Sequence, residues 1–250
     1  PADCRTDSGR VLNRRTGQTL GYGELVETAT GLPLPRQSTP KNPRDFRIIG
    51  TDIELCDGPE MVDGRAVYGL DVAVPGMLVA TVVRCPVFGG RVGSLDSGAA
   101  LAVPGVRRVT RIGSGVAVVA DNTWAALQGR DALRIQWASD PDVNSDDIRS
   151  SLRSRAPVPG GISGDAQRLE AGYEMPFYAH APMEPMACVA HVREDGCEVW
   201  VPTQNPQAAS RAAQRTCGLP ADQVTVHVTL IGGGFGRRLE VDYVREAVEI

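Results

Sequence analysis

The apolar positions along the chain divide it into stretches of different character. Residues 1–57 carry short apolar runs broken by glycine and proline, so we expect an irregular segment with one helix over Tyr22–Thr30. Residues 58–140 alternate strand-like apolar runs with a helical stretch, which predicts a small α/β domain. Its strands are expected at residues 77–88, 105–113, 115–121 and 132–138, and its helix at residues 122–132 with Asp121, Asn122 or Thr123 as cap.

The second half begins with a connection and continues with another domain. Residues 141–170 are predicted to form a linker, apart from a helix over residues 145–155 capped by Ser145. Residues 171–250 predict an α+β domain. Its expected elements are a hairpin over residues 187–203 that turns at Asp195 and Gly196, a helix that begins at Asn205 and Pro206 and ends at Gly218, and a half-buried strand over residues 224–231.

A short amphipathic helix is expected after the glycine-rich residues 232–236. Its apolar stripe is formed by Leu239, Tyr243, Ala247 and Ile250, and Arg238 is expected to pair with Asp242. No glycine, asparagine or proline ends this helix. Because such a stripe needs a surface to cover it, we expect the chain to be part of a larger protein. A frayed terminal helix is the alternative.

Composition and charge exclude several classes of protein. The chain has 250 residues, 42% of them hydrophobic, and a formal net charge of −4, so it lacks the basic surface typical of a nucleic-acid-binding protein. No apolar run approaches the length of a membrane span. The six cysteines are scattered without a CxxC pair, which argues against a zinc knot or an iron–sulfur cluster in this chain. We expect buried free thiols, and a Cys188–Cys197 bridge in an oxidising compartment stays open.

The stretch LIGGGFGRRLE, residues 230–240, has the layout of an anion-binding site. Glycines between a strand and a helix let the backbone approach a ligand, and the amides at the helix start favour an anion. Arg237 and Arg238 add charged donors. The stretch lacks the GK[ST] of a phosphate-binding loop and the last glycine of GxGxxG. Two alternatives are a tight turn without a ligand and a phosphate- or nucleotide-binding domain.

Other candidate ligands give weaker signals. His180 and Glu184 stand four residues apart, but Pro182 and Pro185 forbid a regular helix between them. We therefore favour a structural hydrogen-bonding role over metal ligation. The remaining candidates are expected to be solvated, hydrogen-bonded or packed rather than ligands: His191, His227, Met183 and Met186.

The order of these motifs resembles a known family. HAPMEPMACVAHV, EVWVPTQNPQ and GGGFGRR follow one another as in the molybdenum-binding subunits of the xanthine dehydrogenase/aldehyde oxidase family. The likeness is strongest to the branch of the isoquinoline 1-oxidoreductase beta subunits, in which arginines follow GGGFG. The resemblance covers about residues 45–250. It implies an α+β protein, with a hammerhead-like α/β domain over residues 58–140 and the first part of a molybdopterin-binding domain over residues 171–250.

The family implies a molybdopterin cofactor with molybdenum, the cytosine dinucleotide form being one option, and the oxidation of N-heterocycles or aldehydes with water as the oxygen source. By position, Gln204 corresponds to a glutamine whose amide lies next to an oxygen ligand of the metal. The residues that correspond to the cofactor loop are Gly233, Gly234, Phe235, Gly236 and Arg237. Leu239 falls in the substrate pocket, where purine-oxidising members often carry glutamate, so a less polar heterocycle or an aldehyde is expected. No protein ligand to the metal is expected.

The resemblance also implies components that lie outside this chain. The general base of the family is a glutamate in a segment with no counterpart here, so no catalytic residue is assigned. The expected partners are the remaining part of the molybdenum subunit or a second subunit, an iron–sulfur subunit that holds the clusters, and a small-molecule substrate. A bacterial location is expected, in the cytoplasm or the periplasm. The alternative function is a non-catalytic scaffold or interaction module of the same fold.

Overall fold

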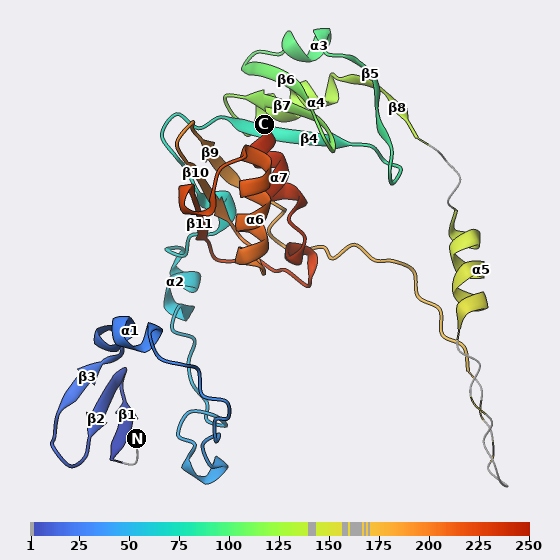
Figure 1. Ribbon diagram of the computed structural model, residues 1–250. Coiled ribbons are helices and arrows are strands. Elements are labelled where there is room, and N and C mark those ends of the chain that lie inside the picture. Colours follow the sequence, from blue (N-terminus) through green and yellow to red (C-terminus); the bar gives the residue numbers. More distant parts are fainter. Residues whose placement is uncertain (1–2, 140–143, 157–159, 161–166, 168, 170) are drawn as a thin grey trace. The chain divides into compact units, whose positions relative to one another are not determined.

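The computed structural model describes residues 3–139, 144–156, 160, 167, 169 and 171–250 (Figure 1). Contacts divide the chain into two compact units, Pro1–Gly58 and Pro59–Ile250, each described by itself below. Much of the expected linker over residues 141–170 lies outside the described residues. Helix α5 (Ser145–Arg155) is present, but its cap is Asn144 and not the expected Ser145, because the Asn144 side chain accepts hydrogen bonds from two backbone nitrogens of the first turn.

The first unit contains a small sheet where the sequence predicted irregular structure. The expected helix α1 (Tyr22–Thr30) is present, but a three-stranded antiparallel meander precedes it. No described residue of this unit is buried. Its strands therefore lack an apolar face, and the sequence carried no clear alternation of apolar and polar residues to predict them. The elements besides α1 are β1 (Cys4–Asp7), β2 (Arg10–Asn13), β3 (Thr19–Gly21) and the 3-10 turn η1 (Pro43–Asp45).

The second unit begins with an antiparallel sheet of order β4-β7-β6 and a separate β5–β8 ribbon. Strand β7 is central, and all of its residues are buried, with helix α4 packed on the sheet. The side chain of Asn122 caps α4, one of the three expected caps. The elements are α2 (Gly58–Asp63), η2 (Gly69–Asp71), β4 (Val79–Arg84), β5 (Arg91–Asp96), α3 (Gly98–Leu101), β6 (Val106–Ile112), β7 (Gly115–Ala120), α4 (Thr123–Asp131) and β8 (Arg134–Ala138).

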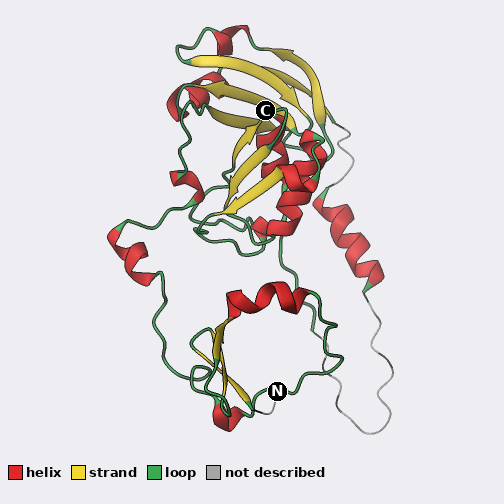
Figure 2. Cartoon of the chain, turned by 60° about the vertical axis from the view of Figure 1, so that its left-hand side comes forward, coloured by secondary structure: helices red, strands yellow, loops and turns green. Residues whose placement is uncertain are grey.

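A second sheet of order β11-β10-β9 follows, and helices α6 and α7 pack against one of its faces (Figure 1, Figure 2). The inward residues Val199 and Val201 meet Ala209 and Ala213 of α6 in a buried cluster. The predicted hairpin and helix are confirmed, and with them the α+β class. The elements are β9 (Val189–Val192), β10 (Cys197–Val201), α6 (Pro206–Cys217), η3 (Ala221–Gln223), β11 (Val224–Val228), η4 (Arg237–Leu239) and α7 (Asp242–Glu249).

Helix α7 differs from its prediction in start and orientation. Leu239 precedes the helix and is 52% exposed, so it is not part of a buried stripe. The buried face is formed by Tyr243, Val244 and Val248, and it packs on α6 and β9 of the same chain. The apolar face of α7 is therefore covered within the chain, so the stripe is not evidence for a missing part of the protein. The spacing of Leu239, Tyr243, Ala247 and Ile250 predicted one continuous helix, but residues 237–239 form a separate 3-10 turn.

The last turn of α7 also contacts the first sheet of the same unit. Buried Glu246 accepts two hydrogen bonds from the guanidinium of Arg84 on β4 and one from the Ser114 hydroxyl at 2.6 Å. The Gly113 nitrogen donates to Glu249 at 2.8 Å. These bonds join the tip of the β6–β7 turn to the helix that follows the glycine-rich residues.

All six cysteines are free thiols, so Cys188 and Cys197 are not bridged. Cys197 is buried as expected, whereas Cys4 and Cys56 are exposed. Among the helices that the structure describes, none has both the length and the apolar character that a membrane crossing requires.

Candidate functional site

The glycine-rich stretch forms a tight loop, residues 232–236, between the end of the second sheet and the turn η4. Gly233 and Gly236 have φ of 93° and 90°, and Phe235 has φ of 51°. Glycine adopts positive φ readily, so Gly233 and Gly236 use the conformational freedom that the sequence predicted for the glycines here. The two ends of the loop are held by side chains, since the Gly232 nitrogen donates to Glu184 at 2.9 Å and the Gly236 nitrogen donates to Gln204 at 3.1 Å.

The middle of this loop presents peptide nitrogens without a partner. Within the described parts of the chain, the backbone nitrogens of Gly233, Gly234 and Phe235 form no hydrogen bond. The Phe235 side chain is 74% exposed, and its ring edge lies beside Gly233, where an added Cβ would be 3.2 Å from Cε2. Peptide donors that lack internal partners need water or a ligand. These three consecutive amides, which we call the amide row, are therefore available to donate to an anionic group.

Gln204 lies against this row. Its Oε1 accepts from the Gly236 nitrogen, so its Nε2 remains as a donor directed away from that bond. A Cβ added to Gly234 would lie 2.6 Å from Gln204 Oε1. Only glycine at this position lets the carboxamide and the loop backbone approach so closely. The structure thus brings together Gln204 and the glycines that the sequence singled out.

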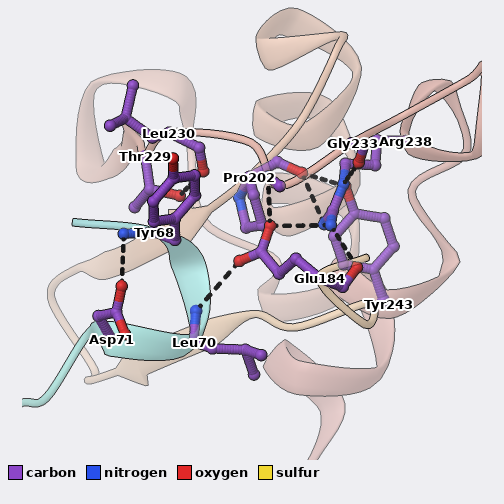
Figure 3. Close-up of polar contacts among 11 residues, drawn as sticks. Tyr68, Leu70, Asp71, Glu184, Pro202, Thr229, Leu230, Gly233, Arg238 and Tyr243 are labelled. Atoms are coloured by element: carbon purple, nitrogen blue, oxygen red, sulfur yellow. Dashed lines mark hydrogen bonds and ion pairs between the residues drawn. The ribbon is translucent and has the colours of Figure 1, made fainter. Parts of the chain in front are cut away.

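A buried ion pair lies beneath the loop (Figure 3). Arg238 is 0% exposed, and its Nη2 donates to Glu184 Oε2 at 2.8 Å. The expected Arg238–Asp242 pair is wrong, because residues 237–239 form a 3-10 turn that directs Arg238 inward. Glu184 has the structural role expected for it, since its carboxylate also accepts from the nitrogens of Gly232 and, at 3.2 Å, Leu70.

Arg237 is partly exposed, unlike Arg238, and is the residue that pairs with Asp242. Its two terminal nitrogens donate to the Asp242 carboxylate at 2.9 and 2.7 Å, and its guanidinium lies 5.9 Å from the Tyr243 ring centre. The hydrogen bonds that Arg237 donates to Asp242 raise the pKa of Arg237. Burial acts to raise the pKa of Asp242, but the bonds and charge of Arg237 outweigh it and lower that pKa overall. The guanidinium of Arg237 is therefore a fixed positive charge beside the loop.

An open hollow of about 260 Å³ lies next to Arg237. Its other lining residues belong to the segment before β9 and include His180, Pro182 and Met186. Gln204 is not among the residues that line it. The hollow shows that the surface beside the loop is concave on the side of Arg237.

The remaining candidates do not form a second site. His227 stacks on Trp200 with ring centres 4.8 Å apart, and its Nε2 lies 3.3 Å from Glu198. His180 is exposed, and no helix joins it to Glu184. In the ranges that the structure describes, no three His, Cys, Asp or Glu side chains gather as a metal-binding group. The buried role of Arg238 was the feature that the sequence did not reveal, since its spacing to Asp242 favoured a surface pair.

Comparison with known proteins identifies the domain that holds the loop. Residues 156–248 match the family model of the molybdopterin cofactor-binding domain. The chain is 32% identical to the beta subunit of isoquinoline 1-oxidoreductase of Brevundimonas diminuta, over 100% of this chain and 39% of that protein. It is 28% identical to a nicotinate dehydrogenase subunit of Pseudomonas putida, over 99% of this chain and 23% of that protein.

A solved structure shares the fold. Quinoline 2-oxidoreductase of Pseudomonas putida 86 matches with a TM-score of 0.63 and 20% sequence identity, over 78% of this chain and 32% of that chain. The present chain thus spans well under half of the length of these three proteins. By the domain match and these relatives, the chain is similar to part of the molybdenum-binding subunits of the xanthine dehydrogenase family.

Proposed function

We propose that this chain forms one wall of the molybdopterin site of a molybdenum hydroxylase that oxidises an N-heterocycle or an aldehyde. The observation that carries the proposal is the row of unbonded amides at Gly233, Gly234 and Phe235, set against Gln204 within the molybdopterin cofactor-binding domain. Such donors suit an anionic group with several oxygen acceptors. The close approach that Gly234 permits keeps the Gln204 carboxamide directly beside these amides.

When bound, the cofactor supplies the two-electron redox chemistry by which a substrate C–H group and water yield a hydroxylated product, two electrons and two protons. The residues of this chain bind and orient. The three amides donate to anionic oxygens, and Nε2 of Gln204 donates to a further oxygen beside them. Arg237 contributes a fixed positive charge, held by Asp242. The cytosine dinucleotide form is our choice of cofactor, since its diphosphate adds negative charge for these donors.

The substrate side of the proposal rests on Leu239. Its side chain is half exposed in the turn after the loop, and it offers an apolar contact. An apolar contact suits an aromatic heterocycle or an aldehyde better than a purine with several hydrogen-bonding groups. The names of the relatives, which act on isoquinoline and nicotinate, support a heterocycle.

We place the general base outside these residues. Glu184 is the carboxylate bonded to the glycine loop, but its oxygens accept from Leu70, Gly232 and Arg238, so they are occupied in holding the loop. The base would come from the remaining part of the molybdenum subunit, and the electrons would pass to an iron–sulfur subunit. We propose a bacterial enzyme of the cytoplasm or the periplasm.

The test is the cofactor content of the assembled protein. The full-length subunit, co-expressed with the products of the neighbouring genes, should purify with about one molybdenum and one pterin per subunit. A folded complex without molybdenum or pterin would refute the proposal and would favour a non-catalytic scaffold. Nucleotide binding that needs no metal would favour a separate phosphate-binding function.

A further inference from the structure

Arg238 forms hydrogen bonds with three separate segments around the glycine loop, which an arginine that served only as a surface charge would not do. Its Nε donates to the Gly233 carbonyl at 2.7 Å, and its Nη1 donates to the Pro202 carbonyl at 3.3 Å. Its Nη2 donates to both the carbonyl and the carboxylate of Glu184, each at 2.8 Å. One side chain thus ties together the glycine loop, the chain before Gln204 and the segment at residue 184 (Figure 3).

The main chain of Arg238 extends this frame to Gln204. The Arg238 carbonyl accepts from the Gln204 nitrogen and from the Thr203 hydroxyl, both at 3.2 Å. Gln204 is therefore held at its backbone by Arg238 and at its side chain by the Gly236 nitrogen. The spacing between the carboxamide and the amide row depends on this one residue.

Stability alone is a poor explanation for this arrangement. Burial of a guanidinium costs solvation, and a buried ion pair can often be replaced by apolar groups without loss of stability. The planar guanidinium instead offers donors in several fixed directions. Each of the three guanidinium nitrogens of Arg238 meets a different part of the site: Gly233, Pro202 or Glu184.

We infer that Arg238 is a positioning residue, which sets the geometry of the amide row and of Gln204 for the cofactor. That Arg238 serves the cofactor rests on the proposed function. That Arg238 holds the loop and Gln204 in place rests only on the hydrogen bonds described above. Lysine retains the charge and can pair with Glu184. Its three N–H donors share one nitrogen, so they cannot replace the three guanidinium nitrogens that separately reach Gly233, Pro202 and Glu184.

The experiment compares Arg238→Lys with wild type in the full-length subunit assembled with its partners. Arg84→Lys is the matched control, because Arg84 also pairs with a buried glutamate, Glu246, away from the glycine loop. We expect Arg238→Lys to lose about ten-fold or more in pterin and molybdenum per folded subunit, as changes to residues that orient a metal site do. Activity per molybdenum should fall through kcat, with KM changed less than about two-fold.

A readout that needs no cofactor accompanies these measurements. Hydrogen exchange of the peptide that contains Gly232 and Gly236 should become about ten-fold faster or more in Arg238→Lys, because each 1.4 kcal/mol lost by the closed loop is a factor of ten in its opening. Arg84→Lys should leave this peptide unchanged.

If Arg238→Lys does not fold, Thr203→Val is a milder variant that still tests the role of Arg238. Thr203→Val removes one bond to the Arg238 carbonyl and leaves the ion pair intact; it also removes the bond that the Asn205 nitrogen donates to the Thr203 hydroxyl at 3.0 Å. It should lower cofactor content by about two- to ten-fold, the range that one hydrogen bond covers. Wild-type exchange and wild-type cofactor content in both variants would overturn the inference. A wild-type complex without molybdenum would instead refute the proposed function, and the exchange data would still decide the role of Arg238.

Discussion

Replacement of Gly234 by alanine separates the binding role of the loop from its stability. A Cβ at this position would lie 2.6 Å from Oε1 and 2.8 Å from Cδ of Gln204. The carboxamide is the exposed end of a flexible side chain, so it moves aside and the loop backbone stays. The move breaks the 3.1 Å bond between Oε1 and the Gly236 nitrogen and displaces Nε2.

The expected change in the free energy of unfolding follows from the hydrogen bond that the substitution breaks. One hydrogen bond contributes about 0.5–1.5 kcal/mol to the free energy of unfolding. The reduced chain entropy of the unfolded alanine variant offsets about 0.4–1 kcal/mol of this loss. The net change is therefore below about 1 kcal/mol, which lowers Tm by less than about 4 °C for a domain of this size. Turnover per molybdenum should fall by about 10- to 100-fold, because Gln204 no longer places its donor.

Gly232→Ala is the matched comparison at the start of the same loop. Its added Cβ would lie 2.5 Å from the Cβ of Glu184, the root of a buried side chain that cannot swing away. Disruption of the Glu184–Arg238 pair costs about 3–5 kcal/mol, which lowers Tm by about 6–20 °C. Thermal unfolding and activity assays of both variants in the assembled protein test the reasoning. Unchanged turnover in Gly234→Ala, or equal loss of Tm in both variants, would refute it.

Three further changes test other parts of the structure. Glu246→Ala should lower the free energy of unfolding by about 1–3 kcal/mol, read from Tm, because it leaves Arg84 without its partner at the junction of the two sheets. Asn205→Ala should cost about 1 kcal/mol through loss of the α6 cap, and Asn205→Gly only a few tenths. Burial raises the pKa of Cys188 to about 12, so a thiol reagent at pH 8 should label exposed Cys4 and spare Cys188. Because the unfolded thiol ionises near pH ~8.5, stability should fall as pH rises from there toward 12, and rising stability would contradict the assignment.

Local signals in the sequence predicted most elements of the second unit. Helix α6 has Asn205 and Pro206 at its start and Gly218 in the left-handed conformation at its end, so its bounds were readable from residue types alone. Strand β7 was readable because its run of small apolar residues is buried on both faces. The glycine loop was found because its glycines, Gln204 and the neighbouring motifs occur in an order typical of one family.

Long-range contacts were not predictable in this way. Strand β5 has a bulge after Val92 and pairs with β8, which follows two other strands and two helices, so no local pattern marks it. Arg238 has acidic residues near it in sequence, yet its partner Glu184 lies 54 residues away. Which of two adjacent arginines turns inward depends on the 3-10 turn at residues 237–239, and helical spacing assigned the pair to the wrong one.

The central claim is that the amides of Gly233, Gly234 and Phe235 hold the cofactor, and an experimental structure of the loaded full-length complex tests it most directly. The quantity to measure is the distance from these three nitrogens to the nearest cofactor oxygen. We predict at least one distance of about 2.7–3.2 Å, the range of an N–H···O hydrogen bond, with Gln204 Nε2 beside the same group. A cofactor bound elsewhere, with these nitrogens facing only water or another part of the polypeptide, would contradict the claim.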